Sequence, residues 1–227
     1  MRTKIKQLAQ SSLLLATLAA STQANANLIV RDGGMVYDDV LDITWLQDAN
    51  YAKTSGYDSD GKMSWDEANA WADELVFGGF DDWRLFNAPV IDTTCTNFAA
   101  DVSYGYNCTS SELGHLFYVD FDLNQGESIL SATGEGLNNF NLFTNIQTHW
   151  YWSGNTVESS PDNALGFINS IGWQGFPTKD THMYGWAVRD GDVANAGGNE
   201  VPEPGSLALL GLAMLGLSAR RYSSSFK

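Results

Sequence analysis

Positive charge is scarce in this sequence, and so are cysteine and histidine. Twelve lysine and arginine residues stand against 27 aspartate and glutamate residues, which gives a net charge of −15 at pH 7. Because phosphate binding needs cations, this balance excludes nucleic acids and anionic lipids as the main partners. The histidines His115, His149 and His182 lack the His-Glu-x-x-His spacing of zinc proteases, so a zinc site would depend on their proximity in the fold. No Gly-x-Ser-x-Gly motif of a serine hydrolase is present either.

No apolar run reaches the roughly 20 residues that a bilayer-spanning helix needs, but shorter runs lie near both ends of the chain. Near the N-terminus, Arg2, Lys4 and Lys6 precede an apolar stretch and the small-x-small pattern Ala24-Asn25-Ala26. This order predicts a secretory signal peptide over residues 1–26, rather than a helix of the fold. Signal peptidase is then one processing partner.

The segment 201–227 predicts a sorting tail with a short transmembrane segment. Pro202, Glu203 and Pro204 precede an apolar run without a polar face, which ends at Arg220 and Arg221. This order resembles the PEP-CTERM sorting signal of Gram-negative bacteria. The resemblance implies processing by the membrane enzyme exosortase, export across the inner membrane and transient anchoring by the tail. The final location is then the cell surface or the extracellular space, in a family associated with exopolysaccharide and biofilms.

Between the two signals lies an acidic segment that is rich in tryptophan. All eight tryptophans of the chain lie in it, which excludes a disordered acidic segment, since such segments contain few aromatic residues. It contains six lysine or arginine residues and 26 aspartate or glutamate residues, so divalent cations and neutral sugars suit it better than polyanions. The small and polar residues 193–200 predict a flexible linker, which leaves residues 27–192 as one domain.

The two cysteines, Cys95 and Cys108, both lie in the part of the chain that is expected to be exported. An even count in an oxidising compartment favours a disulfide between them. The bridge would close a loop of about 14 residues and contribute about 3 kcal/mol in the chain-entropy model. A catalytic cysteine pair is the alternative.

Capping boxes predict two helices in the domain. Ser64-Trp65-Asp66-Glu67 begins an apolar pattern with helical spacing, which predicts a helix over residues 65–77 that Gly78-Gly79 ends. A second box, Thr109-Ser110-Ser111-Glu112, predicts a shorter helix. Its apolar side would carry Leu113, Leu116 and Phe117.

Strands are expected near both ends of the domain. Residues 35–39 and 42–46 predict an N-terminal hairpin, and residues 149–154, 163–169 and 184–191 predict late antiparallel strands. Strands, two helices, a long loop and further strands together predict the α+β fold class.

The order of several sequence pieces resembles the Lcl C-terminal domain family, a bacterial family of poorly defined function. The resemblance covers about residues 28–192, with one departure at Phe86, where the family usually has a proline. It implies a compact fold similar to C-type lectins and formylglycine-generating enzymes, with the N-terminal and C-terminal strands paired. The most specific pieces are Gly79-Phe80-Asp81-Asp82-Trp83-Arg84-Leu85 and Trp186-Ala187-Val188-Arg189-Asp190-Gly191. The others are MVYDDVLDITWLQDAN, MSWDEANAWADEL, SELGHLFY and YWSG.

The two arginines of these motifs, Arg84 and Arg189, have a structural interpretation. Each lies among aspartate and tryptophan residues, namely Asp82 and Trp83 in the first motif and Trp186 and Asp190 in the second. We expect charge-assisted hydrogen bonds that tie strands or loops together, with ligand binding as the alternative.

Calcium is the one cofactor that the sequence suggests. Asp58, Asp60 and Glu67 fall at positions 3, 5 and 12 of an EF-hand loop, although position 1 is Gly56 instead of an aspartate. An Asp-Gly turn that leads into the helix at residue 65 explains the same residues without calcium.

Trp150 and Trp152 are the candidate residues for glycan contact. Alternation in a strand places them on one face and Tyr151 on the other. Exposed aromatic rings would stack on sugar rings, whereas buried rings would belong to the core.

These observations predict an exported, exosortase-sorted surface or extracellular-matrix protein that binds exopolysaccharide or another surface glycan without catalysis. One alternative is an enzyme, either on a scaffold like that of formylglycine-generating enzymes or as a glycosidase. Another is a structural protein of the biofilm matrix with no small ligand.

Overall fold

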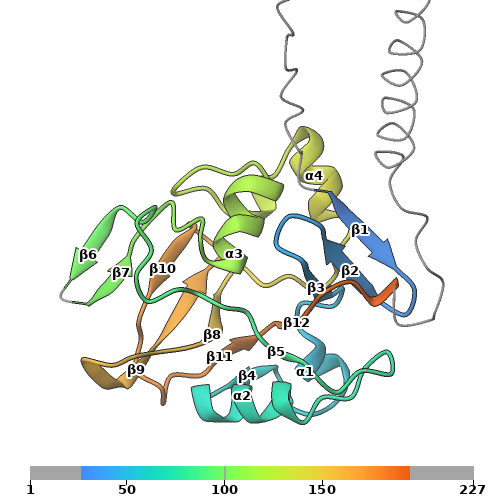
Figure 1. Ribbon diagram of the computed structural model, residues 1–227, viewed down its shortest axis with the longest axis horizontal. Coiled ribbons are helices and arrows are strands. Elements are labelled where there is room, and N and C mark those ends of the chain that lie inside the picture. Colours follow the sequence, from blue (N-terminus) through green and yellow to red (C-terminus); the bar gives the residue numbers. More distant parts are fainter. Residues whose placement is uncertain (1–26, 100, 195–227) are drawn as a thin grey trace, which may run out of the picture.

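The computed structural model describes residues 27–99 and 101–194, which form two five-stranded sheets, a two-stranded hairpin and short helices (Figure 1). The predicted α+β class is confirmed in this coarse sense. The expected signal peptide, the sorting tail and most of the linker lie outside the described residues. Among the described residues, no helix is long and apolar enough to cross a membrane.

The first sheet joins strands from both ends of the domain in the order β1-β2-β3-β12-β5, with all neighbours antiparallel. The predicted hairpin is confirmed, since Met35 pairs with Leu46 and Asp38 with Ile43. The C-terminal strand β12 lies beside β3, so N-terminal and C-terminal strands share one sheet, as the family resemblance implies. The bounds are β1 Leu28–Arg31, β2 Met35–Asp38, β3 Ile43–Leu46, β5 Arg84–Leu85 and β12 Ala187–Asp190.

The second sheet has the order β10-β9-β8-β11-β4. The predicted antiparallel pairing of β8 with β9 is confirmed, but β11 runs parallel to β8, which corrects the expectation of antiparallel strands throughout. Residues 184–191, expected as one strand, are divided at Trp186 between β11 and β12 in different sheets. The bounds are β4 Lys62–Met63, β8 Trp150–Val157, β9 Ser160–Ile168, β10 Trp173–Gly175 and β11 Met183–Gly185.

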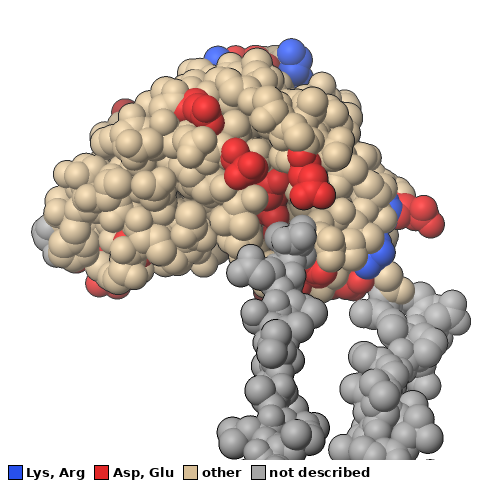
Figure 2. All heavy atoms as spheres, turned by 90° about the horizontal axis from the view of Figure 1, so that it is seen from above, with Lys and Arg blue, Asp and Glu red and all other residues tan. Residues whose placement is uncertain are grey.

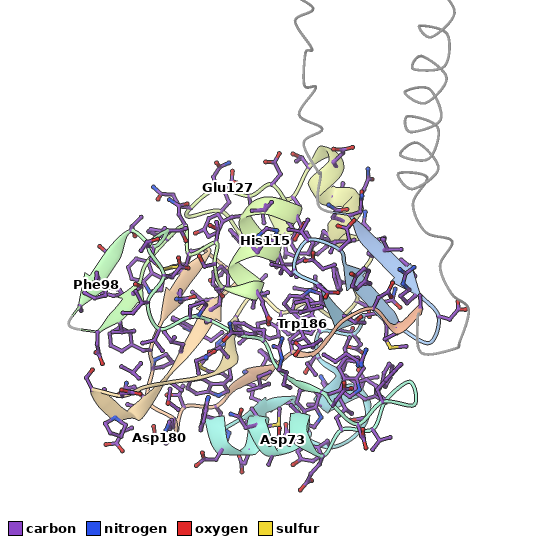
Figure 3. All side chains as sticks on the ribbon, in the orientation of Figure 1. Asp73, Phe98, His115, Glu127, Asp180 and Trp186 are labelled. Carbon is purple, nitrogen blue, oxygen red and sulfur yellow. A yellow bond between two sulfur atoms is a disulfide. The ribbon has the colours of Figure 1, made fainter. Side chains whose placement is uncertain are left out.

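This division has a physical cause in the packing of Trp186, which lies at the centre of the molecule (Figure 3). The side chain is fully buried, and its indole Nε1 donates to the carbonyl of Leu46 at 2.8 Å. Its ring lies 5.0 Å from that of Trp45 in the first sheet and 5.7 Å from that of Tyr151 in the second. The chain therefore changes sheet where one large ring anchors both sheets to a shared core.

The helix at Ser64 begins as predicted and ends earlier. The Ser64–Glu67 capping box is present, and α2 spans Trp65–Asp73. It ends before the predicted limit at residue 77 because residues 77–80 form a turn, in which Phe77 and Phe80 exchange backbone hydrogen bonds of 3.0 Å. Gly78 and Gly79 allow this turn through their positive φ angles of 63° and 87°.

The second helix, α3 over Glu112–His115, has a different cap from the one predicted. Its N-cap is Ser111, whose side chain accepts from the Gly114 amide, so the frame that began at Thr109 is wrong. The reason is that Glu112 turns away from the helix end to bind Arg84. A π-helical turn over Leu116–Asp120 continues α3, and the predicted apolar side is fully buried.

Several short elements were not predicted from the sequence. They are α1 Tyr51–Thr54, β6 Asn97–Ala99, β7 Val102–Tyr104, the 3-10 turn Ile129–Ser131 and α4 Gly134–Phe140.

Candidate functional site

A polar pocket of about 370 Å³ opens where the segment after β5 meets β8. Two backbone contacts hold this junction: the Gly154 amide donates to the Phe86 carbonyl at 3.0 Å, and the Ala88 amide donates to Asn155 Oδ1 at 2.8 Å. Helix α2 forms one wall through Asn69. The lining residues are Asn69, Arg84, Leu85, Phe86, Asn87, Glu112, Gly154 and Asn155.

A second pocket of about 470 Å³ continues the first along β8. Both pockets are lined by Gly154 and Asn155, so we treat them as one surface and call it the β8 groove. The second part adds a hydroxyl and two carboxylates, and also Ile91, whose exposed fraction of 55% gives the groove an aliphatic surface. Its lining residues are Val90, Ile91, Asp101, Gly154, Asn155, Thr156 and Glu158.

Amide groups without protein partners are the distinctive feature of the β8 groove. Asn69 Nδ2 donates to the Trp65 carbonyl and Asn155 Oδ1 accepts from Ala88. Within the described part of the chain, the other amide atoms, Asn69 Oδ1 and Asn155 Nδ2, have no hydrogen-bond partner, and neither has the side chain of Asn87. The groove therefore presents donors and acceptors side by side, which suits a ligand rich in hydroxyl groups.

Arg84 lies at the end of the groove and ties three elements together. Its guanidinium donates to both carboxylate oxygens of Glu112 on α3, at 2.8 and 2.9 Å. It also donates to Asp190 Oδ1 on β12 at 2.6 and 3.2 Å, and to the Leu85 carbonyl at 3.2 Å. These five bonds use every N–H of the side chain. Burial lowers the pKa of Arg84, but bonding to Glu112 and Asp190 raises it by more, so the guanidinium stays charged.

Arg189 forms a second ion pair away from the groove. Its Nε and Nη2 donate to the two oxygens of Asp82 at 2.8 Å each, and its guanidinium lies 4.1 Å from the centre of the Phe80 ring. The bond from Arg189 lowers the pKa of Asp82. Trp83, which follows Asp82 in the sequence, is buried. The motif residues that the sequence singled out thus fasten the turn at residues 77–83 to β12.

The carboxylates of the predicted calcium loop bind their own backbone. Asp58 Oδ1 accepts from the amides of Asp60 and Gly61 at 2.9 and 2.7 Å, and Asp60 Oδ1 accepts from Lys62 at 3.0 Å. Burial would raise the pKa of Asp58, but these backbone bonds outweigh it and lower the pKa. Glu67 Oε2 accepts from the Ser64 amide and hydroxyl at 2.8 Å each. These hydrogen bonds are those expected of an Asp-Gly turn without a metal ion. Calcium binding by this loop stays a prediction.

Trp152 is wrong as a glycan contact, because its side chain is fully buried and its Nε1 donates to the Met63 carbonyl at 3.0 Å. Tyr151 on the opposite face of β8 is equally buried, so both faces of the strand meet the core at this point. Trp150 is partly buried and packs against the core. Its indole lies close to Gly175, where an added Cβ would come within 3.0 Å of the ring.

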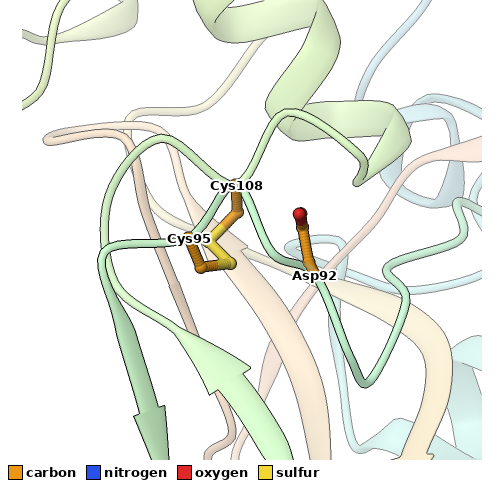
Figure 4. Close-up of side chains that lie close together, drawn as sticks. All are labelled: Asp92, Cys95 and Cys108. Atoms are coloured by element: carbon orange, nitrogen blue, oxygen red, sulfur yellow. A yellow bond between two sulfur atoms is a disulfide. The ribbon is translucent and has the colours of Figure 1, made fainter.

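The predicted disulfide between Cys95 and Cys108 is present (Figure 4). Asp92 lies beside it and completes the only group of three or more His, Cys, Asp or Glu residues in 27–99 and 101–194 whose ligand atoms all lie within 4.8 Å of one another. In the oxidised protein both sulfurs are bonded to each other. The Asp92 carboxylate accepts from Thr94 and Ser110, so this cluster holds the loop together.

The acidic balance of the sequence is visible on the surface. Figure 2 shows one face, on which acidic side chains gather in the middle and basic ones lie at the margins. Beneath the surface, Asp38 and Asp120 are buried, and the partly buried His115 places its Nε2 4.0 Å from Asp120 Oδ2. His149 and His182 are exposed, so the three histidines do not form one site.

The amides of the β8 groove were not predicted from the sequence. Asn69, Asn87 and Asn155 belong to a helix, a loop and a strand that are far apart along the chain, and single asparagines carry no spacing signal. The one available hint was the YWSG piece, since Gly154 of that piece and the following Asn155 lie in both parts of the groove.

Comparisons with known proteins support both resemblances drawn from the sequence. The Lcl C-terminal domain family matches residues 34–189, and the PEP-CTERM protein-sorting motif matches residues 200–221. Searches of the curated proteins and of the solved structures found no match.

Proposed function

The chain belongs to the Lcl C-terminal domain family and carries a PEP-CTERM sorting motif, and on this premise we propose that its domain binds an exopolysaccharide or another surface glycan in the β8 groove. The motif supports an exosortase-sorted protein at the cell surface or outside the cell. In this proposal the cell is a Gram-negative bacterium, and the tail anchors the protein in the inner membrane until exosortase acts.

The unpartnered amides of the groove are the observation that carries the proposal. Sugar hydroxyls both donate and accept, and Asn69, Asn87 and Asn155 offer both kinds of atom at one surface. The exposed side chain of Ile91 offers an aliphatic contact for the C–H face of a sugar ring. The carboxylates of Asp101 and Glu158 favour neutral or amino sugars over uronates and sulfated sugars, because like charges repel.

We propose binding rather than catalysis because Glu112, the carboxylate in the first part of the groove, is already engaged. Glu112 accepts two hydrogen bonds from Arg84 and a third from the Asn87 amide at 2.6 Å. A carboxylate whose oxygens are occupied by three hydrogen bonds is poorly placed to reach a glycosidic oxygen.

The proposal extends to the organisation of the chain. Residues 1–26 are a signal peptide, 27–192 the binding domain, 193–200 a linker and 201–227 the sorting tail. For the domain we propose kinship with the folds of C-type lectins and formylglycine-generating enzymes. The pairing of β12 with β3 supports this proposal.

A glycan array with the purified protein tests the function, and a variant that fills the groove tests the site. A Cβ added at Gly154 lies 3.8 Å from the Leu85 carbonyl oxygen and 3.9 Å from Asn69 Oδ1, so a Cβ fits here without a clash, next to two residues that line the groove. Gly154→Leu is therefore chosen to fill the groove. We expect it to weaken glycan binding at least about tenfold, which corresponds to about 1.4 kcal/mol.

Ser131→Leu at an exposed position outside the groove is the matched control, and it should bind as the parent does. Equal binding by the parent and by Gly154→Leu would place any glycan site elsewhere. Turnover of an oligosaccharide, instead of binding, would replace the proposal with an enzyme.

A further inference from the structure

Asp38, His115 and Asp120 form a cluster of ionisable side chains that the β8 groove does not include. Asp38 ends β2, and Asp120 ends the π-helical turn that follows α3. His115, which is labelled in Figure 3, ends α3. Asp38 is fully buried and Asp120 has an exposed fraction of 3%. The side chain of His115 keeps 14% of its surface exposed, which leaves an edge of the cluster open to solvent.

Most polar atoms of this cluster have no partner within the described part of the chain. Asp38 Oδ1 accepts from the amides of Val40 and Leu41, at 3.0 Å each. Asp38 Oδ2, His115 Nε2 and both carboxylate oxygens of Asp120 accept or donate no hydrogen bond. Buried polar groups are nearly always hydrogen-bonded, since burial without a partner costs them the hydrogen bonds that water would provide. Four such atoms on three neighbouring side chains indicate that something outside the chain satisfies them.

The charges of these three side chains do not balance one another. His115 Nε2 and Asp120 Oδ2 are 4.0 Å apart, which is too long for a hydrogen bond. A protonated imidazole could balance one carboxylate, but Asp38 and Asp120 together carry two negative charges when ionised. A divalent cation balances both and takes the imidazole as a neutral ligand.

We propose that Asp38, His115 and Asp120 bind one divalent transition-metal ion of the zinc type. Ligand atoms of such an ion lie about 2.0–2.2 Å from the metal in tetrahedral geometry, so neighbouring ligand atoms are about 3.3–3.6 Å apart. His115 Nε2 and Asp120 Oδ2 are 4.0 Å apart, so metal binding has to draw these two atoms closer together. Imidazole among the ligands selects zinc, nickel or copper over calcium and magnesium, which prefer all-oxygen sites.

Asp38 supplies the third ligand only after a movement toward the other two side chains. The three ligand atoms do not all lie within 4.8 Å of one another in this structure, so binding has to draw Asp38 Oδ2 toward the other two. That oxygen has no hydrogen bond to break, whereas Oδ1 stays anchored on the Val40 and Leu41 amides. A backbone-anchored carboxylate with one unbound oxygen is a suitable third ligand, because its other bonds orient it.

Calorimetric titration of the full-length protein with zinc chloride, after purification in a chelator, tests the site. We expect one zinc ion per chain. Asp120→Asn should lower the affinity at least tenfold, because the amide keeps the shape of the side chain but loses its charge. Since the change also removes an unpaired buried acid, the metal-free variant should melt no lower than the parent, which separates loss of binding from loss of the fold.

His115→Gln should lose the zinc response in the same way, and His182→Ala is the matched control, because it removes an exposed histidine outside the cluster. Absence of zinc binding by the parent would overturn the proposal. So would an equal affinity in the parent and in Asp120→Asn, or loss of binding in His182→Ala alone.

Discussion

At Asp120, a carboxyl group lies inside the protein without the hydrogen bonds that buried acids normally receive. Burial, together with the nearby carboxylates of Asp38 and Asp39, raises the pKa of Asp120 to about 8. Burial also lowers the pKa of His115, more than the carboxylate of Asp38 raises it. Asp120 and His115, which would carry opposite charges in water at about pH 5, are therefore both driven toward their neutral forms in the metal-free protein.

We expect the contribution of Asp120 to the stability of the metal-free protein to fall as the pH rises. Its folded-state pKa of about 8 lies above the ordinary value of 3.8, so the folded protein retains this proton to a higher pH than the unfolded chain does. The contribution is therefore complete below about pH 4 and is lost as the pH rises through about 8. Asp120→Asn should raise the Tm more at pH 8 than at pH 5, as measured in EDTA. Equal increments at the two pH values would contradict this.

Two glycines of the loop before β4 provide a matched test of close packing. Gly61 has φ of +83°, and an added Cβ would lie 1.9 Å from Asn50 Oδ1. Gly56 has a similar φ of +80°, with nothing within 4 Å. Gly56→Ala should therefore cost about 1–2 kcal/mol of unfolding free energy from backbone strain alone, and Gly61→Ala clearly more. Urea unfolding measures both, and equal losses would show that Asn50 moves away at no cost.

Calcium binding at Asp58, Asp60 and Glu67 is a separate prediction. Extracellular calcium modules have Kd values of about 10⁻⁴–10⁻³ M, so millimolar calcium should raise the Tm of the parent. The double variant Asp58→Ala, Asp60→Ala should lose that increment. Magnesium at matched ionic strength controls for charge screening, and the same calcium shift in parent and variant would exclude this loop.

At the scale of elements, local signals were sufficient where the local sequence controls the backbone. The Ser64 capping box located the start of α2, and the alternating residues 35–39 and 42–46 located the hairpin of β2 and β3. Long-range contacts decided the rest. Glu112 binds Arg84 instead of capping the helix as expected, and the strand expected over residues 184–191 is divided at Trp186 between two sheets. A local sequence pattern reveals neither of these long-range contacts.

The cap of α3 gives a test of that correction. The Ser111 hydroxyl accepts from the Gly114 amide, whereas Thr109 contacts the loop through its backbone amide, which donates to Thr94. Ser111→Ala should cost about 1–2 kcal/mol of unfolding free energy, and Thr109→Ala less than about 0.5 kcal/mol. Denaturant unfolding of both variants measures the two losses. A larger loss in Thr109→Ala than in Ser111→Ala would support Thr109 as the N-cap instead of Ser111.

The site was harder to predict than the fold. The sequence identified the motif arginines, both of which are engaged in ion pairs, and it suggested Trp152, which is buried. The groove amides and the Asp38–Asp120 cluster are brought together only by the pairing of distant strands and helices. Their residue types are common, so no pattern along the chain distinguishes them.

At the scale of the whole molecule, an ion pair ties the last described residues to the first strand. Arg31 on β1 donates to both oxygens of Asp192, at 2.7 and 2.6 Å, and this pair fastens the end of the domain to its first strand. Deletion of residues 202–227 should therefore leave a soluble protein with a cooperative melt and a Tm within a few degrees of the parent. Circular dichroism melting checks this, and aggregation or a broad transition would contradict the division between domain and tail.

The last strand of the domain, β12, lies between β3 and β5, and this position affects when the chain can fold during export. Strand β11 joins β4 to β8, and β12 joins β3 to β5, so residues 183–190 complete both sheets. A chain that crosses a membrane N-terminus first cannot close either sheet until these residues have emerged. The matched sorting motif begins at residue 200, only a short way behind them. We therefore expect the protein to become able to fold at about the moment when its tail reaches the membrane, which makes translocation, folding and sorting nearly simultaneous events.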